Sequence, residues 1–238
     1  MLNKTKCFKI HLTFGIKNID SNIEKFTKNN SKGYVCVVDI NVLSMTFTDP
    51  DYFKIVNNAT FNTCDGGFLA FLKNIKSKES KKYHSYNGPE IFKKYIIRND
   101  IKQLLIGSNS SDFKLLKNMI PRHSHLYNME LPFKDVDQFN YNQISKEVNK
   151  IKPQIIWVML GAPKQEIFIS KIYPLLENGL IFGSGAALNF FFNRINNRAF
   201  SIYGMRFIWL ERIFYEPKKQ LKRIFIFLKV LPKIIKYI

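Results

Sequence analysis

The chain has 238 residues, 46% of them hydrophobic, and its 37 basic and 18 acidic side chains give a formal net charge of +19. This length and apolar content are enough to bury one sizeable core, in one or two domains. No stretch of about 18 uninterrupted apolar residues predicts a transmembrane helix, and the N-terminus lacks the apolar core of a signal peptide. Cys7, Cys36 and Cys64 form no CxxC pattern, so a disulfide framework is excluded and a reduced, cytoplasmic protein is the default.

The positive charge favours an anionic partner, which means nucleic acid, an acidic membrane surface or a phosphate-bearing substrate. A general skew toward Lys, Asn and Ile explains the charge equally well without any function. Nucleic acid is the weakest of the three partners, because the aromatic residues fall inside apolar runs and no RNA-binding signature is visible. We therefore expect no nucleic-acid partner.

Short apolar runs alternate with segments that suit helices. Buried strands are predicted at residues 34–41, 103–108, 155–162 and 179–185. Helix starts are predicted at residues 48–51, 87–90 and 110–112 and after Pro163. This alternation predicts an α/β fold over residues 1–197, a Rossmann-like parallel sheet with helices on both faces. In such folds ligands bind beyond the carboxyl ends of the strands.

Composition changes after residue 197, and residues 198–238 are predicted to form a basic C-terminal appendage. A helical projection of residues 218–236 gathers the basic side chains in an arc of about 140°. They are Lys218, Lys219, Lys222, Arg223, Lys229, Lys233 and Lys236, and they face Leu221, Ile224, Phe225, Leu228, Leu231 and Ile235. This pattern predicts a helix on an anionic membrane; a helix packed on the core with a solvated basic face is the alternative. Pro232 is expected to kink or end the helix.

Several polar residues stand beside glycines or at the end of a predicted strand. Asp65 precedes two glycines, which let a backbone approach a ligand closely, although an Asp-Gly pair is more often a simple turn. Asp39 and Asn41 alternate at the end of one predicted strand, so they would share a side of the sheet, and capping of a following helix is an equal alternative.

Two glycine turns follow the later strands. The turn at residues 183–188 is a partial dinucleotide fingerprint with Leu188 in place of the third glycine, which disfavours a dehydrogenase but allows phosphate at a helix N-terminus. The Asp-x-Asp triplets at residues 49–51 and 135–137 are better explained as a helix cap and a polar loop, so no metal site is expected. The histidines at residues 123 and 125 lack partners at ligand spacing and predict a surface loop.

Six segments, in order, resemble the WecG/TagA/CpsF family of bacterial glycosyltransferases over nearly the whole chain. They are VVDIN, TCDGG, NGPEIF, WVMLGAPKQE, FGSGAALNFF and the tail RAF…WLERIFYEPKK. The resemblance implies a metal-independent enzyme, peripheral at the inner face of the cytoplasmic membrane. It would move a sugar, typically N-acetylmannosamine, from a UDP-sugar to a polyprenyl-diphosphate-linked acceptor, and it is compatible with a homo-oligomer.

The resemblance also implies roles for individual residues. Asp65 corresponds to the proposed general base. The expected substrate contacts are Asp39, Asn41, Gly66, Gln165, Glu166 and Asn189. The residues expected near the phosphates of UDP are Gly161, Gly183, Gly185, Arg198 and Arg212, and those expected to contact the membrane are Lys218, Lys219, Lys222 and Arg223.

Some positions depart from the family pattern, and they keep a second hypothesis open. The departures are Asp39, Ser85, Asn189, Phe200 and Ile208. A catalytically lapsed relative that only binds nucleotide-sugar, or that scaffolds a membrane assembly, would tolerate such changes. The donor sugar, the acceptor and the linkage are left open by the sequence.

Overall fold

A six-stranded parallel sheet forms the centre of the computed structural model, which describes residues 2, 4–77, 82–195, 201–202, 205–206 and 217–238. The strand order is β4-β3-β8-β7-β5-β6. The strands are β3 (Gly33–Val38), β4 (Phe61–Cys64), β5 (Gln103–Ile106), β6 (Leu126–Met129), β7 (Ile155–Val158) and β8 (Leu180–Gly183). Two antiparallel pairs lie outside the sheet: β1 (Thr5–Cys7) with β2 (Ile10–Leu12), and β9 (Ser201–Ile202) with β10 (Met205–Arg206).

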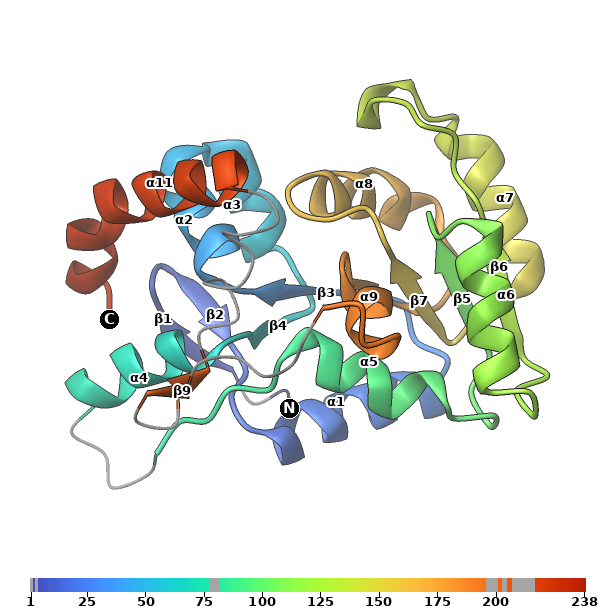
Figure 1. The fold of residues 1–238 in the computed structure, drawn as a ribbon, viewed down its shortest axis with the longest axis horizontal. Helices are drawn as coiled ribbons and strands as arrows, with labels where there is room; N and C mark the ends of the chain where they lie inside the picture. Colours follow the sequence, from blue (N-terminus) through green and yellow to red (C-terminus); the bar gives the residue numbers. More distant parts are fainter. Residues whose placement is uncertain (1, 3, 78–81, 196–200, 203–204, 207–216) are drawn as a thin grey trace.

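Helices cover both faces of the sheet (Figure 1). One core contains side chains of α2 (Ile40–Thr48), α3 (Pro50–Asn57), α4 (Gly67–Lys76), α7 (Tyr141–Ile151), α8 (Lys164–Ile172) and α11 (Pro217–Lys236). The other contains side chains of α1 (Ile16–Lys28), α5 (Gly88–Ile96), α6 (Ser110–Met119) and α9 (Ala187–Phe191). Short 3₁₀ turns occupy η1 (Val136–Gln138) and η2 (Tyr173–Leu175).

Strand β7 shows why the apolar runs are continuous. Ile155 and Trp157 point into one core, whereas Ile156 and Val158 point into the other, so every residue of the strand is buried. A strand covered on both faces needs apolar side chains at every position rather than at alternate ones. The predicted α/β fold with a parallel, doubly covered sheet is confirmed.

The polar triplets have local structural roles. Asp49 caps α3, because its Oδ1 accepts the N–H groups of Asp51 at 2.9 Å and Tyr52 at 3.0 Å, as the sequence predicted. Asp137 forms an ion pair with Lys171 of α8. The prediction of a surface loop is wrong for His123, which is buried with its Nε2 3.1 Å from Gln103 Nε2.

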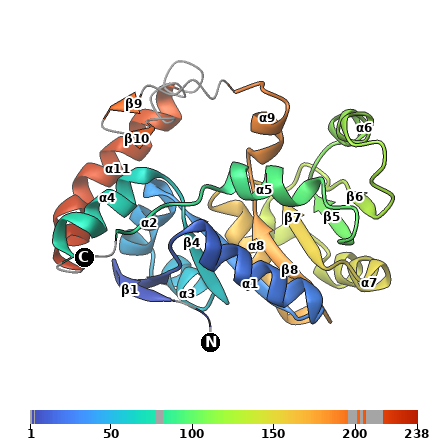
Figure 2. The same cartoon turned by 90° about the horizontal axis from the view of Figure 1, so that it is seen from below.

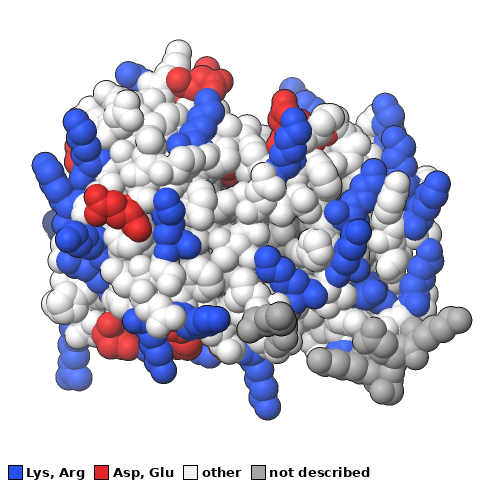
Figure 3. Space-filling model, turned by 180° about the vertical axis from the view of Figure 1, so that it is seen from behind, with Lys and Arg blue, Asp and Glu red and all other residues white. Residues whose placement is uncertain are grey.

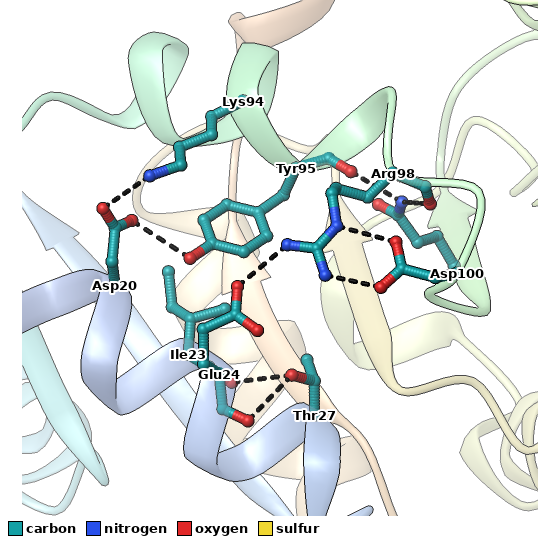
Figure 4. A network of polar contacts seen from close by, with 9 residues as sticks. Asp20, Ile23, Glu24, Thr27, Lys94, Tyr95, Arg98 and Asp100 are labelled. Carbon is teal, nitrogen blue, oxygen red and sulfur yellow. Dashed lines mark hydrogen bonds and ion pairs between the residues drawn. The ribbon is translucent and has the colours of Figure 1, made fainter.

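A polar network joins α1 to α5 on the second face (Figure 4). Asp20 accepts hydrogen bonds from Lys94 at 2.7 Å and from the Tyr95 hydroxyl at 3.0 Å. Arg98 donates to Glu24 at 2.9 Å and, through Nε, to Asp100 at 2.7 Å. The acidic side chains of this contact lie on α1, and their basic partners lie on α5 or just after it, so opposite charges join the two helices.

Helix α11 packs against α2 and lies beside α4 (Figure 2). Only a narrow strip of it is buried, formed by Gln220, Val230 and Ile234 with the partly buried Phe227. Its last turn is fixed by two distant elements: the Phe8 N–H donates to the Tyr237 carbonyl at 2.6 Å, and Lys76 Nζ donates to the Ile235 carbonyl at 2.6 Å.

The expectation that Pro232 would end this helix is wrong, because α11 continues four residues beyond it to Lys236, and a kink at Pro232 stays a prediction. Pro232 and Leu228, whose carbonyl loses its i→i−4 partner at a proline, both lie on the exposed side of the helix. Within the described ranges no helix is both long and apolar enough to cross a membrane.

Candidate active site

The predicted site residues gather at the carboxyl edge of the sheet, where β4, β3, β8 and β7 end side by side. Asp39 follows β3 and Asp65 follows β4. The Asp65 N–H donates to the Val38 carbonyl at 2.9 Å, which holds the two carboxylate residues on neighbouring strands. Both side chains are partly exposed. Two acidic groups therefore face the region where α/β proteins bind ligands.

Asp39 is the N-cap of α2, and this settles the alternative left open by the sequence. Its Oδ1 accepts the Val42 N–H at 2.7 Å. Because the helix begins at Ile40, Asp39 and Asn41 do not alternate on a strand, and that expectation is wrong. Asn41 lies in the first turn of α2 and is partly exposed, so it stays at the same edge.

The Asp65-Gly66-Gly67 turn links β4 to α4. Gly66 has φ +87° and ψ 136°, a conformation that essentially only glycine adopts. A side chain built on Gly66 would meet no atom within 4 Å, so open space lies beside Asp65. The Tyr86 N–H donates to the Cys64 carbonyl at 3.0 Å and brings the start of α5 next to this turn.

Gln165 holds the two glycine turns of the site together. Its Oε1 accepts the N–H of Gly161, after β7, at 3.1 Å and the N–H of Gly185, after β8, at 2.9 Å. A Cβ on Gly183 would lie 2.8 Å from Gln165 Nε2, so only glycine leaves room for this amide. One buried side chain thus fixes both turns against each other.

Glu166 lies beneath Gln165 and is fully buried. Gln165 Nε2 donates to its Oε1 at 2.7 Å, whereas Oε2 has no hydrogen bond within standard geometry. The Tyr52 hydroxyl lies close to Glu166, and burial first, then the charge of Glu166, raise its pKa; no closer partner for this hydroxyl is present among the described residues. Burial is the main cause that raises the pKa of Glu166 to about 7. The negative charge of Asp39 also raises this pKa, whereas Gln165 and Tyr52 lower it.

These observations revise part of the predicted site. Glu166 is fully buried and its observed partner is Gln165, so direct contact between Glu166 and substrate stays a prediction that would need this carboxylate to become accessible. The N–H groups of Gly161 and Gly185 already donate to Gln165, so contact of these glycines with phosphate stays a prediction that must rely on close approach. Asn189 is partly exposed on α9 at the same edge.

Some of the predicted site residues lie outside the part of the chain that the structure describes. Arg198 and Arg212 lie outside the described residues, as does the side chain of Lys219. In the part of the chain that is described, no group of three His, Cys, Asp or Glu side chains is placed to hold a metal ion. Sequence reasoning missed Tyr52, because a tyrosine in an amphipathic helix gives no sign that it faces a carboxylate. It also missed Gly88, where a Cβ would lie 3.0 Å from Val37 Cγ1.

A parallel sheet covered by helices on both faces, with two carboxylates and two glycine turns at its carboxyl edge, defines a Rossmann-like α/β protein. Residues 10–238 match the Glycosyl transferase WecG/TagA/CpsF family, and the chain belongs to this family. It is 19% identical over 212 residues to the Bacillus subtilis (strain 168) protein named N-acetylglucosaminyldiphosphoundecaprenol N-acetyl-beta-D-mannosaminyltransferase. The alignment covers 85% of this chain and 82% of that relative.

Replacing Gln165 tests the clasp. In Gln165→Leu the N–H groups of Gly161 and Gly185 lose their acceptor, and each lost hydrogen bond is expected to cost about 1–3 kcal/mol of unfolding free energy. Urea denaturation measures the loss, which we expect to reach roughly 2 kcal/mol or more. The matched control is the neighbouring Lys164→Leu, whose Nζ donates to the Lys134 carbonyl and not to either glycine turn; an equal loss in both variants would contradict the clasp.

The Glu166 carboxyl predicts a pH dependence of stability. Its pKa rises from 4.5 to about 7 on folding, so between these values the folded protein holds a proton that the unfolded chain has released. Stability therefore falls as pH rises from about 4.5 to about 7, by roughly 3 kcal/mol, and is constant above that range. Glu166→Gln, a neutral isostere, should lack this fall; parallel urea curves for both proteins at pH 5 and pH 8 measure it. A constant difference between the two would refute the prediction.

Proposed function

We propose that the protein transfers a sugar, an N-acetylhexosamine such as N-acetylmannosamine, from a UDP-sugar to a polyprenyl-diphosphate-linked acceptor. The product would serve surface polysaccharide or wall polymer synthesis. The observation that carries the proposal is the partly exposed Asp65 carboxylate at the carboxyl edge of the sheet, in a member of a glycosyltransferase family. The name of the Bacillus subtilis relative states both an N-acetylmannosaminyl group and a diphosphoundecaprenol acceptor, and it supports this choice.

In the proposed reaction Asp65 is the general base. It takes the proton of the acceptor hydroxyl as that oxygen attacks the anomeric carbon of the donor. The bond between the anomeric carbon and the phosphate oxygen breaks, and UDP leaves with the electron pair. Gly66 is exposed, and no atom of the described residues lies within 4 Å of the place that a Cβ would take there, which leaves room for the acceptor beside the carboxylate.

The leaving diphosphate needs positive charge or hydrogen-bond donors near it. The Gly161 and Gly185 N–H groups donate to Gln165, so these turns would contribute backbone without side chains, which diphosphate can approach closely. The compensating charge would then come from the basic C-terminal region, where the resemblance places Arg198 and Arg212. No metal ion takes part in this proposal.

Asp65→Asn tests the assignment of the base. The substitution keeps the shape of the side chain but removes its ability to accept a proton, so turnover should fall by at least about 100-fold. UDP release is measured with a panel of UDP-sugars and a polyprenyl-diphosphate-sugar acceptor, with Asp39→Asn beside it to separate loss of charge from loss of the base. Retained release in Asp65→Asn would refute the role. UDP binding without release by the wild type would favour the lapsed relative.

The C-terminal helix supports a peripheral membrane location at the inner face of the cytoplasmic membrane. Helix α11 docks through its narrow buried strip, so its apolar side and its basic side both face solvent. The exposed apolar residues are Leu221, Phe225, Leu228 and Ile235, and the exposed lysines next to them are Lys218, Lys222, Lys229, Lys233 and Lys236. Arg223 lies closer to the docked strip and is only partly exposed. This arrangement suits an interface between anionic headgroups and acyl chains.

Reversing two lysines tests the electrostatic part of this attraction. Each basic residue contributes about 1 kcal/mol near an anionic surface, so Lys222→Glu with Lys229→Glu should weaken binding at least about tenfold. Co-sedimentation with phosphatidylglycerol–phosphatidylcholine vesicles measures it. The control pair Lys146→Glu and Lys150→Glu makes the same change on α7 and should bind as the wild type does. Equal losses in both pairs would show that only net charge matters.

A further inference from the structure

Helix α4, which also contacts β10, carries apolar side chains that the described residues leave exposed. Leu69 and Ala70 are buried in the core, whereas Phe71 is 41% and Ile75 is 63% exposed. Phe71 and Ile75 are four residues apart and lie on one side of the helix, opposite the buried pair. Apolar side chains of this size gain free energy when they leave water, so this face favours a partner.

Helix α11 lies directly beside this face. The Phe68 ring meets the Phe227 ring edge-on with centroids 5.9 Å apart, and Lys76 Nζ donates to the Ile235 carbonyl at 2.6 Å. Ile235 is one of the exposed apolar residues of α11, so the contact of Lys76 with its carbonyl places the end of α4 beside the side of α11 that carries those residues.

The two exposed faces consequently form one surface, the α4–α11 apolar surface. It consists of Phe71, Ile75, Leu221, Phe225, Leu228 and Ile235. Phe225 is its most exposed member at 71%. Exposed lysines border it along α11, and Lys76 borders it along α4. The view from behind shows basic side chains over the whole visible face, including this end of the molecule, on the right (Figure 3).

We propose that α4 binds the lipid bilayer together with α11, with the α4–α11 apolar surface among the acyl chains and its lysines on anionic headgroups. This inference rests on the peripheral membrane location proposed above and adds an element of the catalytic domain to the contact. An apolar surface with a border of one charge sign matches a bilayer better than it matches a second copy of this chain, because two copies would bring lysines together.

A consequence for catalysis follows from where α4 begins. Its first residue, Gly67, comes two residues after Asp65, and Phe71 lies about 6 Å further along the helix axis. Contact of Phe71 with lipid therefore sets the height of Asp65 above the bilayer. The hydroxyl of an acceptor whose diphosphate sits among the headgroups would be presented at this height.

The test replaces the apolar residues of α4 without changing any charge. Phe71→Ser with Ile75→Ser should lower the affinity for phosphatidylglycerol–phosphatidylcholine vesicles at least about tenfold. The control pair, Leu115→Ser with Met119→Ser, has the same spacing and similar exposure on α6 and should bind as the wild type does. At about 0.5 M salt the headgroup attraction is screened. The α4 deficit should persist there, whereas the deficit of the Lys222–Lys229 pair should shrink. Thermal unfolding without vesicles checks that each variant is folded.

Distinct results would overturn the inference. If the α4 pair binds vesicles as the wild type does while the lysine pair does not, α4 lies outside the contact and the proposed membrane location stands. If the α4 pair changes the sedimentation coefficient of the protein without vesicles, and leaves vesicle binding unchanged, the surface joins copies of the chain. If the wild type does not bind anionic vesicles at all, the membrane location itself fails.

Discussion

The candidate site depends on one side-chain amide that lies between two strands. Gln165 accepts hydrogen bonds from turns that follow β7 and β8, and its own position depends on a buried carboxyl group that accepts from its Nε2. A backbone N–H without an acceptor is costly when water cannot reach it, so these bonds define one arrangement of the glycine turns. The surface offered to a ligand is thereby fixed from inside the protein.

Sequence patterns predicted the central strands well, because a strand covered on both faces must be apolar at every position. The two outer strands were missed for physical reasons. In β4 the buried Asn62 donates to the carbonyls of His11 and Val56, both at 3.0 Å, a compensation that no local pattern reveals. Strand β6 is a partly exposed edge strand with a mixed sequence. The start of α2 was misassigned because the apolar run of β3 continues into the helix without a change of period.

The positions of site residues along the chain were easier to predict than their surroundings. Gln165 could be placed after a predicted strand and Asp65 in a glycine turn, but the burial of Glu166 depends on α3, more than 100 residues earlier in the chain. A helical projection divided α11 into basic and apolar sides. It could not show that docking uses a third, narrower strip between them, because that choice is made by the shape of α2 and of the β1–β2 turn.

The strand order has a consequence for how the chain is made. Strand β8 is the last strand of the sheet to be synthesised, yet it lies between β3 and β7, and it pairs with β3 across almost 150 residues of sequence. Until residues 180–183 have left the ribosome, β3 and β7 each present an open edge within a growing polypeptide. Such long-range pairing is slow and leaves nascent chains prone to aggregate. Completion of the sheet and closure of the two glycine turns are thus a single late event in biogenesis, and a prematurely terminated chain could form neither.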